Sequence, residues 1–134
     1  MFYLGKNSRK RLSECHFGLQ NLFDEVIRHQ NCAVLAGHRG KLEQDRALYE
    51  GRSKLCYPLS KHNKKPSWAV DVVPWFYTPP HIRWEDREKF YYFGGFVLAI
   101  AAKMGIVIRW GGDWDQDGEL HDQTFFDLPH FELI

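Results

Sequence analysis

Segments with the apolar spacing of a helix alternate along this chain with short segments that have the character of strands. From Phe17 to His29 the apolar residues recur mostly at intervals of three and four positions, which is the stripe of a helix that lies on a core. The apolar run from Cys32 to Ala36 ends at Gly37 and indicates a buried strand. Helix and strand signals that alternate in this way favour an α+β domain.

The rest of the chain continues this alternation. Residues Lys41 to Glu50 have a helical pattern, and the candidates for the inner face of this helix are Leu42, Ala47 and Leu48. The longest helix signal runs from Trp84 to Met104 and ends at Gly105. Further strands are predicted at Trp68 to Val73, Ile106 to Trp110 and His130 to Ile134, with polar loops at residues 53–66 and 111–119.

Composition limits both the size of the fold and its partners. With 134 residues, of which 44% are hydrophobic, the chain can form one compact core but is too short for two ordinary domains. We therefore expect a single domain over residues 1–134, without a separate binding module. The 18 Lys and Arg nearly cancel the 17 Asp and Glu, so the charge does not indicate binding to nucleic acid or to a membrane surface. Neither a signal peptide nor an apolar run of about 18 residues is present, so we expect no membrane span.

The three cysteines do not form a recognisable metal or redox motif. Cys15, Cys32 and Cys56 are widely spaced, and no two of them form a CxxC pair. Such cysteines suit a reducing cytosol, where they act as small buried hydrophobic residues.

An isolated carboxylate stands in the predicted strand AVDVV. Asp71 is flanked by branched apolar residues, and burying a carboxylate there is costly unless a cation or several hydrogen-bond donors meet it. His62 lies in the polar loop nine residues before Asp71. A bound metal would supply the cation that compensates for burying Asp71, but two ordinary alternatives stay open at this point. Asp71 could lie on the exposed side of an edge strand, or it could accept hydrogen bonds from a neighbouring loop.

The C-terminal segment DQTFFDLPHFELI places a second carboxylate close to a second histidine. Asp127 precedes His130 by three residues, and Pro129 between them forbids a regular helix and favours an extended or turned backbone. Such a turn can direct both side chains into one cavity. A catalytic zinc commonly takes three His and carboxylate ligands and leaves a fourth position for water. His62, Asp71 and His130 would supply these ligands, and Asp127 would remain to take a proton from the water.

Taken together, the segments SKHN, PSWAVDVVPW, GGDW and DLPHFEL resemble those of the D-alanyl-D-alanine carboxypeptidase and L-alanyl-D-glutamate endopeptidase family of zinc peptidases, many of which are phage endolysins. The resemblance runs from about Leu4 to the C-terminus. In that family an SxH element, a downstream AxD element and a C-terminal histidine bind the zinc, which selects His62, Asp71 and His130. The family's general base is an acidic residue three positions before the last histidine, and this position is Asp127.

The resemblance also suggests a role for an arginine. The element GHRG offers Arg39 as the residue that helps to hold the substrate carbonyl in related enzymes. One departure concerns the first two ligands, because nine residues lead from His62 to Asp71 and the best-known members have seven. The extra residues lie within NKKPS, and a loop can absorb such an insertion. The departure therefore bears on substrate preference more than on the ligands.

The resemblance implies an α+β domain in which helices pack on a central antiparallel sheet that carries the zinc site. It also implies a zinc peptidase that cleaves peptidoglycan stem peptides at the L-alanyl-D-glutamate bond, as a monomeric phage or prophage endolysin. Such an enzyme accumulates in the host cytoplasm and reaches the cell wall after the membrane is permeabilised. Two alternatives stay open: a D-alanyl-D-alanine carboxypeptidase or dipeptidase, and a zinc-binding module without catalysis.

A second, weaker metal signal lies in the run DWDQDGEL. Its residues occupy the first, third, fifth and sixth positions of a calcium loop, with Asp113, Asp115, Asp117 and Gly118. The twelfth position is Thr124, where such loops have a bidentate Glu. Calcium binding and a solvated turn both stay open, and the half-matched template favours the turn.

The remaining histidines lie outside these patterns. Four are predicted to be surface or capping residues: His16, His29, His38 and His81. His121 lies close to the acidic run and is not assigned to the site. Trp114 is a candidate either for the wall of the substrate cleft or for the core.

Overall fold

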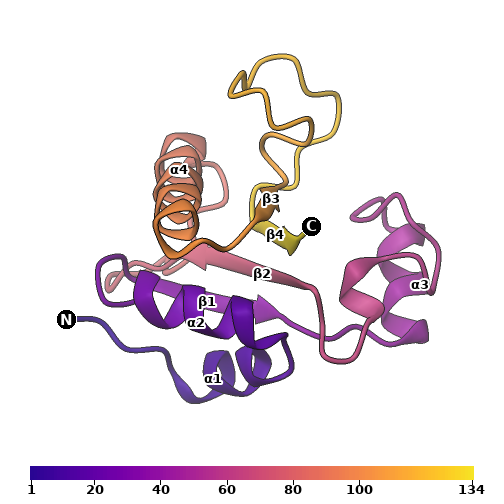
Figure 1. Ribbon diagram of the computed structural model, residues 1–134, viewed down its shortest axis with the longest axis horizontal. Coiled ribbons are helices and arrows are strands. Elements are labelled where there is room, and N and C mark those ends of the chain that lie inside the picture. Colours follow the sequence, from indigo (N-terminus) through magenta and orange to yellow (C-terminus); the bar gives the residue numbers. More distant parts are fainter.

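A four-stranded sheet forms the centre of the computed structural model, which describes residues 1–134 (Figure 1). Its strands lie in the order β1-β2-β4-β3, with bounds β1 (Cys32–Ala36), β2 (Ala69–Pro74), β3 (Ile108–Trp110) and β4 (His130–Leu133). Every neighbouring pair is antiparallel, which confirms the predicted central antiparallel sheet. Because β2 has a partner on each side, Asp71 does not lie on an edge strand, and that alternative was wrong.

Four α-helices and one short 3₁₀-helix accompany the sheet: α1 (Lys6–Ser13), α2 (Phe17–Val26), α3 (Lys41–Tyr49), α4 (Arg87–Met104) and η1 (Lys61–Asn63). The side chain of His16 caps the start of α2, and the side chain of Asp86 caps the start of α4. The prediction began α4 three residues too early, at Trp84. α4 ends at Gly105, whose φ of 72° is the left-handed conformation that favours glycine. None of the helices combines the length and the apolar character needed to cross a bilayer.

One face of the sheet carries the apolar core. Val70 and Val72 flank Asp71 in β2, Phe131 lies between His130 and Glu132 in β4, and the three apolar side chains are fully buried on one face. Phe23 of α2 and Phe93 of α4 meet the ring of Phe131 edge-on, at centroid distances of 5.5 and 6.1 Å. These two helices therefore cover one face of the sheet, while α3 is set apart near the end of β1 (Figure 1).

The N-terminal helix α1 has no counterpart among the predicted elements. It contacts β1, where the Ser8 hydroxyl accepts a hydrogen bond from the Val34 N–H at 2.9 Å. The Arg11 guanidinium donates to the Val34 carbonyl at 3.1 Å. Unpaired backbone groups on an edge strand invite association with other chains. The helix thus closes the free edge of the sheet with side-chain hydrogen bonds.

The inner face of α3 differs from the prediction. Leu42 and Leu48 are exposed, whereas Ala47 is buried together with Gln44. The Gln44 amide forms hydrogen bonds with four surrounding residues: Arg39, Ser53, Leu55 and Asn63. This helix therefore packs on a loop through a satisfied polar side chain, and apolar spacing alone identified only one of its inner residues.

Candidate metal centre

The face of the sheet opposite the core carries a row of ionisable side chains. Asp71 pairs with His130 between β2 and β4, and Arg109 pairs with Glu132 between β3 and β4. Successive side chains of a strand point to opposite faces, so all four lie on the face away from Phe131. The register of the sheet thus produces a row in which acidic and basic groups alternate.

Three potential metal ligands from distant parts of the chain meet at one end of this row. His62 Nε2 lies 3.2 Å from Asp71 Oδ1, and His130 Nδ1 lies 3.4 Å from the same oxygen. One ligand atom from each of the three residues lies within 4.8 Å of the others. The three residues that the sequence selected as zinc ligands are therefore adjacent in the fold.

The orientation of His62 is fixed from the opposite side of its ring. η1 holds the residue in place, and the Ser60 side chain caps this turn. His62 Nδ1 donates to the Gly37 carbonyl at 2.7 Å, so Nε2 faces Asp71. A Cβ at Gly37 would lie 2.3 Å from the Arg11 carbonyl oxygen. Glycine is therefore required where this segment packs against α1, and this packing brings the Gly37 carbonyl to His62.

His130 is oriented in the same way, by a carboxylate that the sequence analysis did not single out. His130 Nε2 donates to Glu132 Oε1 at 2.8 Å, so Nδ1 faces Asp71. Glu132 Oε2 is held by Arg109 at 2.8 Å and by Lys61 at 3.3 Å. The signal for Glu132 was available, since it lies two residues after His130 in a predicted strand and so shares its face.

The pKa shifts reflect the concentration of unlike charges at this point. Burial alone raises the pKa of Asp71, but the imidazoles of His62 and His130 outweigh it and hold that pKa well below its usual range. Burial lowers the pKa of His130, yet hydrogen bonds to Asp71 and Glu132 outweigh this effect and raise it to about 9. Two ring nitrogens and a carboxylate oxygen that face one another require a positive charge, which a proton or a metal ion can supply.

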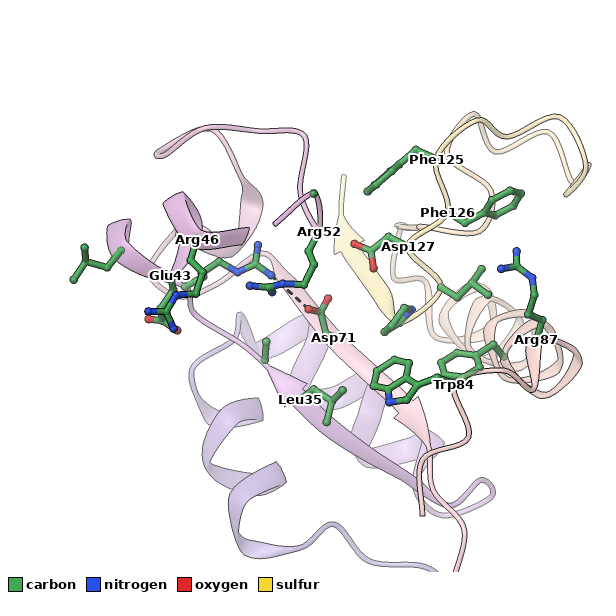
Figure 2. Close-up of a pocket in the computed structure, with 17 residues that line it drawn as sticks. Leu35, Glu43, Arg46, Arg52, Asp71, Trp84, Arg87, Phe125, Phe126 and Asp127 are labelled. Atoms are coloured by element: carbon green, nitrogen blue, oxygen red, sulfur yellow. Dashed lines mark ion pairs between the residues drawn. The ribbon is translucent and has the colours of Figure 1, made fainter. Parts of the chain in front are cut away.

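Asp127 lies beside the three candidate ligands, at the start of a tight turn that ends at His130. The His130 N–H donates to the Asp127 carbonyl at 3.0 Å, so the segment with Pro129 is turned as predicted. The Asp127 carboxylate approaches His130 Nδ1 to 3.9 Å and points into the same space as Asp71 (Figure 2). Burial, and then the negative charge of Asp71, raise the pKa of Asp127 to about 6.

Arg39 also reaches the site. Its Nη2 lies 3.5 Å from Asp71 Oδ2, an ion pair drawn as a dashed line in Figure 2. Its Nη1 donates to Gln44 at 3.0 Å, and its side chain is only 12% exposed. Asp71 and Gln44 therefore hold the guanidinium beside the candidate metal ligands.

Two cavities open next to the metal centre, with volumes of about 820 and 520 Å³. The larger cavity extends from α3 to the start of α4 over the end of β1 (Figure 2). The smaller one is bordered by the loop before η1 and by Trp114. Four residues line both cavities: Arg39, Arg52, Phe125 and Asp127. Asp127 thus stands where the two cavities meet.

Trp114 lines the smaller cavity rather than the core. Its ring centroid lies 5.4 Å from that of His130, and its indole N–H donates to the Phe125 carbonyl at 2.8 Å. Of the two interpretations of Trp114, the structure supports the cleft.

The run DWDQDGEL (residues 113–120), here called the acidic loop, also brings its carboxylates together. Carboxylate oxygens of Asp113, Asp115 and Asp117 lie within 4.8 Å of one another. Asp113 is buried; its Oδ2 accepts from the Gly118 N–H at 2.9 Å, and its Oδ1 has no hydrogen-bond partner. Burial is the main cause that raises the pKa of Asp113. Thr124, at the twelfth position of the loop template, lines the smaller cavity instead.

The histidines outside the pattern are not part of the candidate metal cluster. His16 caps α2, His29 bonds to Glu25, and His81 stacks on Trp75. His38 is half-buried and His121 is exposed. None of these five is among the residues that converge on Asp71.

Comparison with known proteins agrees with this arrangement. A family model described as phage L-alanyl-D-glutamate peptidase matches residues 1–134. The L-alanyl-D-glutamate peptidase of Escherichia phage T5 is 28% identical over 138 residues, covering 99% of this chain and 98% of the relative. The crystal structure of the L-Ala D-Glu endopeptidase ChiX of Serratia marcescens has the same fold, with a TM-score of 0.72 and 24% identity; the match covers 98% of this chain and 90% of that one. The chain belongs to the phage L-alanyl-D-glutamate peptidase family.

Proposed function

We propose that this chain is a zinc endopeptidase that hydrolyses the L-alanyl-D-glutamate bond of bacterial peptidoglycan. The observation that carries this proposal is the convergence of His62, Asp71 and His130 beside Asp127, at the junction of two cavities. Membership of the family supports the reaction class. The name of the phage T5 relative supports the choice of bond.

The donor set fits zinc. Two imidazoles and one carboxylate are common ligands of a catalytic zinc, which keeps a further position open. Each imidazole uses its second ring nitrogen in a hydrogen bond, to Gly37 for His62 and to Glu132 for His130, as metal-binding histidines usually do. Bound to these residues, zinc would polarise a peptide carbonyl and lower the pKa of water.

We assign the general base to Asp127. Its carboxylate is close to the ligands, but it is not part of the set of mutually adjacent ligand atoms. In this role Asp127 takes a proton from the attacking water and passes it to the leaving amine, so that the C–N bond breaks after the new C–O bond has formed. Arg39 is assigned as a donor to the developing oxyanion. Removing one such donor typically costs about 2.7 to 4 kcal/mol of transition-state stabilisation.

We further assign the chain to host lysis, as a phage or prophage endolysin. In this role it acts as a monomer in a single domain, accumulates in the host cytoplasm and reaches peptidoglycan after the membrane is permeabilised. Affinity for the wall then comes from the catalytic cleft. A D-alanyl-D-alanine carboxypeptidase or dipeptidase is the alternative enzyme, and a non-catalytic zinc module is the alternative from another class.

Digestion of purified peptidoglycan distinguishes these functions. The protein should release new N-terminal D-glutamate, detected by mass spectrometry of the products. Asp127→Asn should retain zinc and lose about 10²- to 10⁴-fold in rate, the usual contribution of a general base. Asp24→Asn, on the exposed side of α2 in a pair with Arg9, is the matched control and should keep full activity. Release of D-alanine alone would favour the carboxypeptidase, and no product at all would favour the non-catalytic module.

We also propose that the acidic loop binds calcium, on the basis of the buried and unpartnered Oδ1 of Asp113 among three adjacent carboxylates. Calorimetry with calcium on the zinc-loaded protein should show binding that Asp113→Asn removes. The affinity should be weak, because Thr124 does not provide the missing bidentate ligand. No heat at millimolar calcium would reject a site even of the weak class, with a dissociation constant of about 10⁻⁴ to 10⁻³ M.

A further inference from the structure

Cationic side chains outnumber carboxylates in the wall of the larger cavity. Its wall contains four guanidinium groups, those of Arg39, Arg46, Arg52 and Arg87. Apart from Asp71 and Asp127, which belong to the catalytic centre, Glu43 is the one carboxylate residue among its lining side chains. Clefts lined by one sign of charge concentrate ligands of the opposite sign. The cavity therefore favours a substrate that carries a carboxylate close to the bond that is cut.

The proposed substrate has such a carboxylate. Glutamate has two carboxyl groups, and a peptide chain continues through only one of them. The other stays free on the residue that contributes the leaving amine, a few bonds from the scissile nitrogen. A guanidinium is suited to this group, because its planar set of donors can hold both carboxylate oxygens at once.

Among the four arginines, Arg52 has the appropriate position. Together with Arg39 it is one of two arginines that line both cavities, so it stands at their junction. Arg39 is already engaged by Asp71 and Gln44. Arg87 lies on the α4 side of the cavity, where it donates to the Tyr91 hydroxyl at 2.8 Å (Figure 2).

The side chain of Arg52 is oriented by a protein partner, but one of its hydrogen-bond donors has none. Its Nε and Nη2 lie 2.9 and 2.8 Å from the same oxygen, Glu50 Oε1, which fixes the plane of the guanidinium. No residue accepts a hydrogen bond from its Nη1. Figure 2 shows the side chain running from the loop after α3 toward Asp71. Nη1 thus remains free of protein partners on a side chain that lines both cavities.

We propose that Arg52 binds the free carboxylate of the D-glutamate residue, an inference that rests on the proposed function. Arg52 thereby selects substrates in which this carboxylate is not amidated. Glu50 acts as the positioning residue that holds the guanidinium in place. The subsite determines which peptidoglycans the enzyme cuts well, because an amide in place of the carboxylate removes the charge that Arg52 recognises.

The test uses two synthetic stem peptides that differ in one group: the D-glutamate carboxyl group through which the peptide chain does not continue is either a free carboxylate or a carboxamide. The zinc-loaded wild-type protein should cleave the carboxylate peptide about tenfold faster in kcat/KM, the scale of one charge-assisted hydrogen bond on a partly exposed arginine. Arg52→Ala should lose this preference by slowing only on the carboxylate peptide. Salt should weaken the preference of the wild-type protein, because exposed charges are screened.

Arg28→Ala is the matched control. Arg28 is 57% exposed and pairs with Glu25, as Arg52 is 55% exposed and pairs with Glu50, but Arg28 does not line either cavity. This variant should keep the wild-type preference. Arg52→Lys, which keeps the charge without the planar donors, should retain part of it. Zinc content and melting temperature, measured for each variant, show that the folded holoenzyme is compared.

The outcomes separate the subsite from the function on which it rests. A wild-type protein that cleaves both peptides equally, or an Arg52→Ala protein that keeps the preference, would overturn the subsite and leave the endopeptidase intact. A zinc-loaded wild-type protein that cleaves neither peptide would overturn the endopeptidase function, and the subsite with it.

Discussion

The two faces of the central sheet are made by the same strands and have opposite chemistry. On one face Val70, Val72 and Phe131 are completely removed from water beneath α2 and α4. On the other face Asp71 and His130, together with Glu132, form the charged row that ends at the metal centre.

This difference shows how a small domain combines a core with a candidate metal site. His130 and Phe131 are neighbours in the sequence, yet one faces the ligands and the other lies under two helices. Strand alternation allows each strand to be anchored by the core while it presents polar groups on the opposite side. The core face should therefore control stability, and the site face should control metal affinity and catalysis.

The largest loss of stability is expected on the core face, from Phe131→Ala. Phe131 is fully buried and lies against three further aromatic rings, so the change should lower the free energy of unfolding by about 3 to 5 kcal/mol. Urea denaturation of the zinc-free protein measures this loss. Phe17→Ala is the control, since Phe17 is 69% exposed and should change stability by less than about 0.5 kcal/mol. Similar losses from both substitutions would refute the assignment of Phe131 to the core.

On the site face, Glu132→Gln should change metal affinity more than stability. The amide can accept from His130 Nε2 but lacks the negative charge that strengthens this hydrogen bond. Loss of such a partner typically weakens metal binding by about 10- to 100-fold. Competition with a chelator measures the zinc affinity, and Glu85→Gln in an exposed turn is the control. Unchanged affinity would show that Glu132 does not prepare His130 for the metal.

Local patterns in the sequence predicted most of the fold. Each of the four strands and three of the four α-helices was expected, because their apolar residues repeat with the period of the element. The helix α1 was missed because it is mostly polar and buries only Ser8 and Leu12. Its role depends on the edge of β1, which lies far along the chain, and such a contact leaves no local pattern.

The sequence predicted the main residues of the candidate site but not the residues that orient them. His62, Asp71, His130, Asp127 and Arg39 all reach one region of the structure. The Gly37 carbonyl orients His62 directly. Lys61 and Arg109 orient His130 through Glu132, from segments that are distant from His130 in the sequence. These contacts depend on strand register and loop path, so composition and spacing could not predict them.

The smallest effect is a difference in thiol reactivity between the interior and the edge of the cleft. Burial is the first cause that raises the pKa of Cys15 and of Cys32 to about 12, so neither forms a reactive thiolate near neutral pH. Cys56 is exposed in the loop beside the smaller cavity. A thiol reagent at pH 8 should therefore modify one cysteine of the native protein and all three after denaturation. Rapid modification of Cys15 or Cys32 in the native protein would contradict the packing described for the interior.

The most direct test of the metal centre is the zinc content of purified His130→Ala, measured beside the wild-type protein and Asp127→Asn. The wild-type chain and Asp127→Asn should each bind one zinc, because all three proposed ligands are present in both. His130→Ala should bind strongly reduced zinc, while its circular dichroism shows a folded domain. Undiminished zinc in His130→Ala would remove this site from consideration, and loss of zinc from Asp127→Asn would place Asp127 among the ligands and contradict its role as the base.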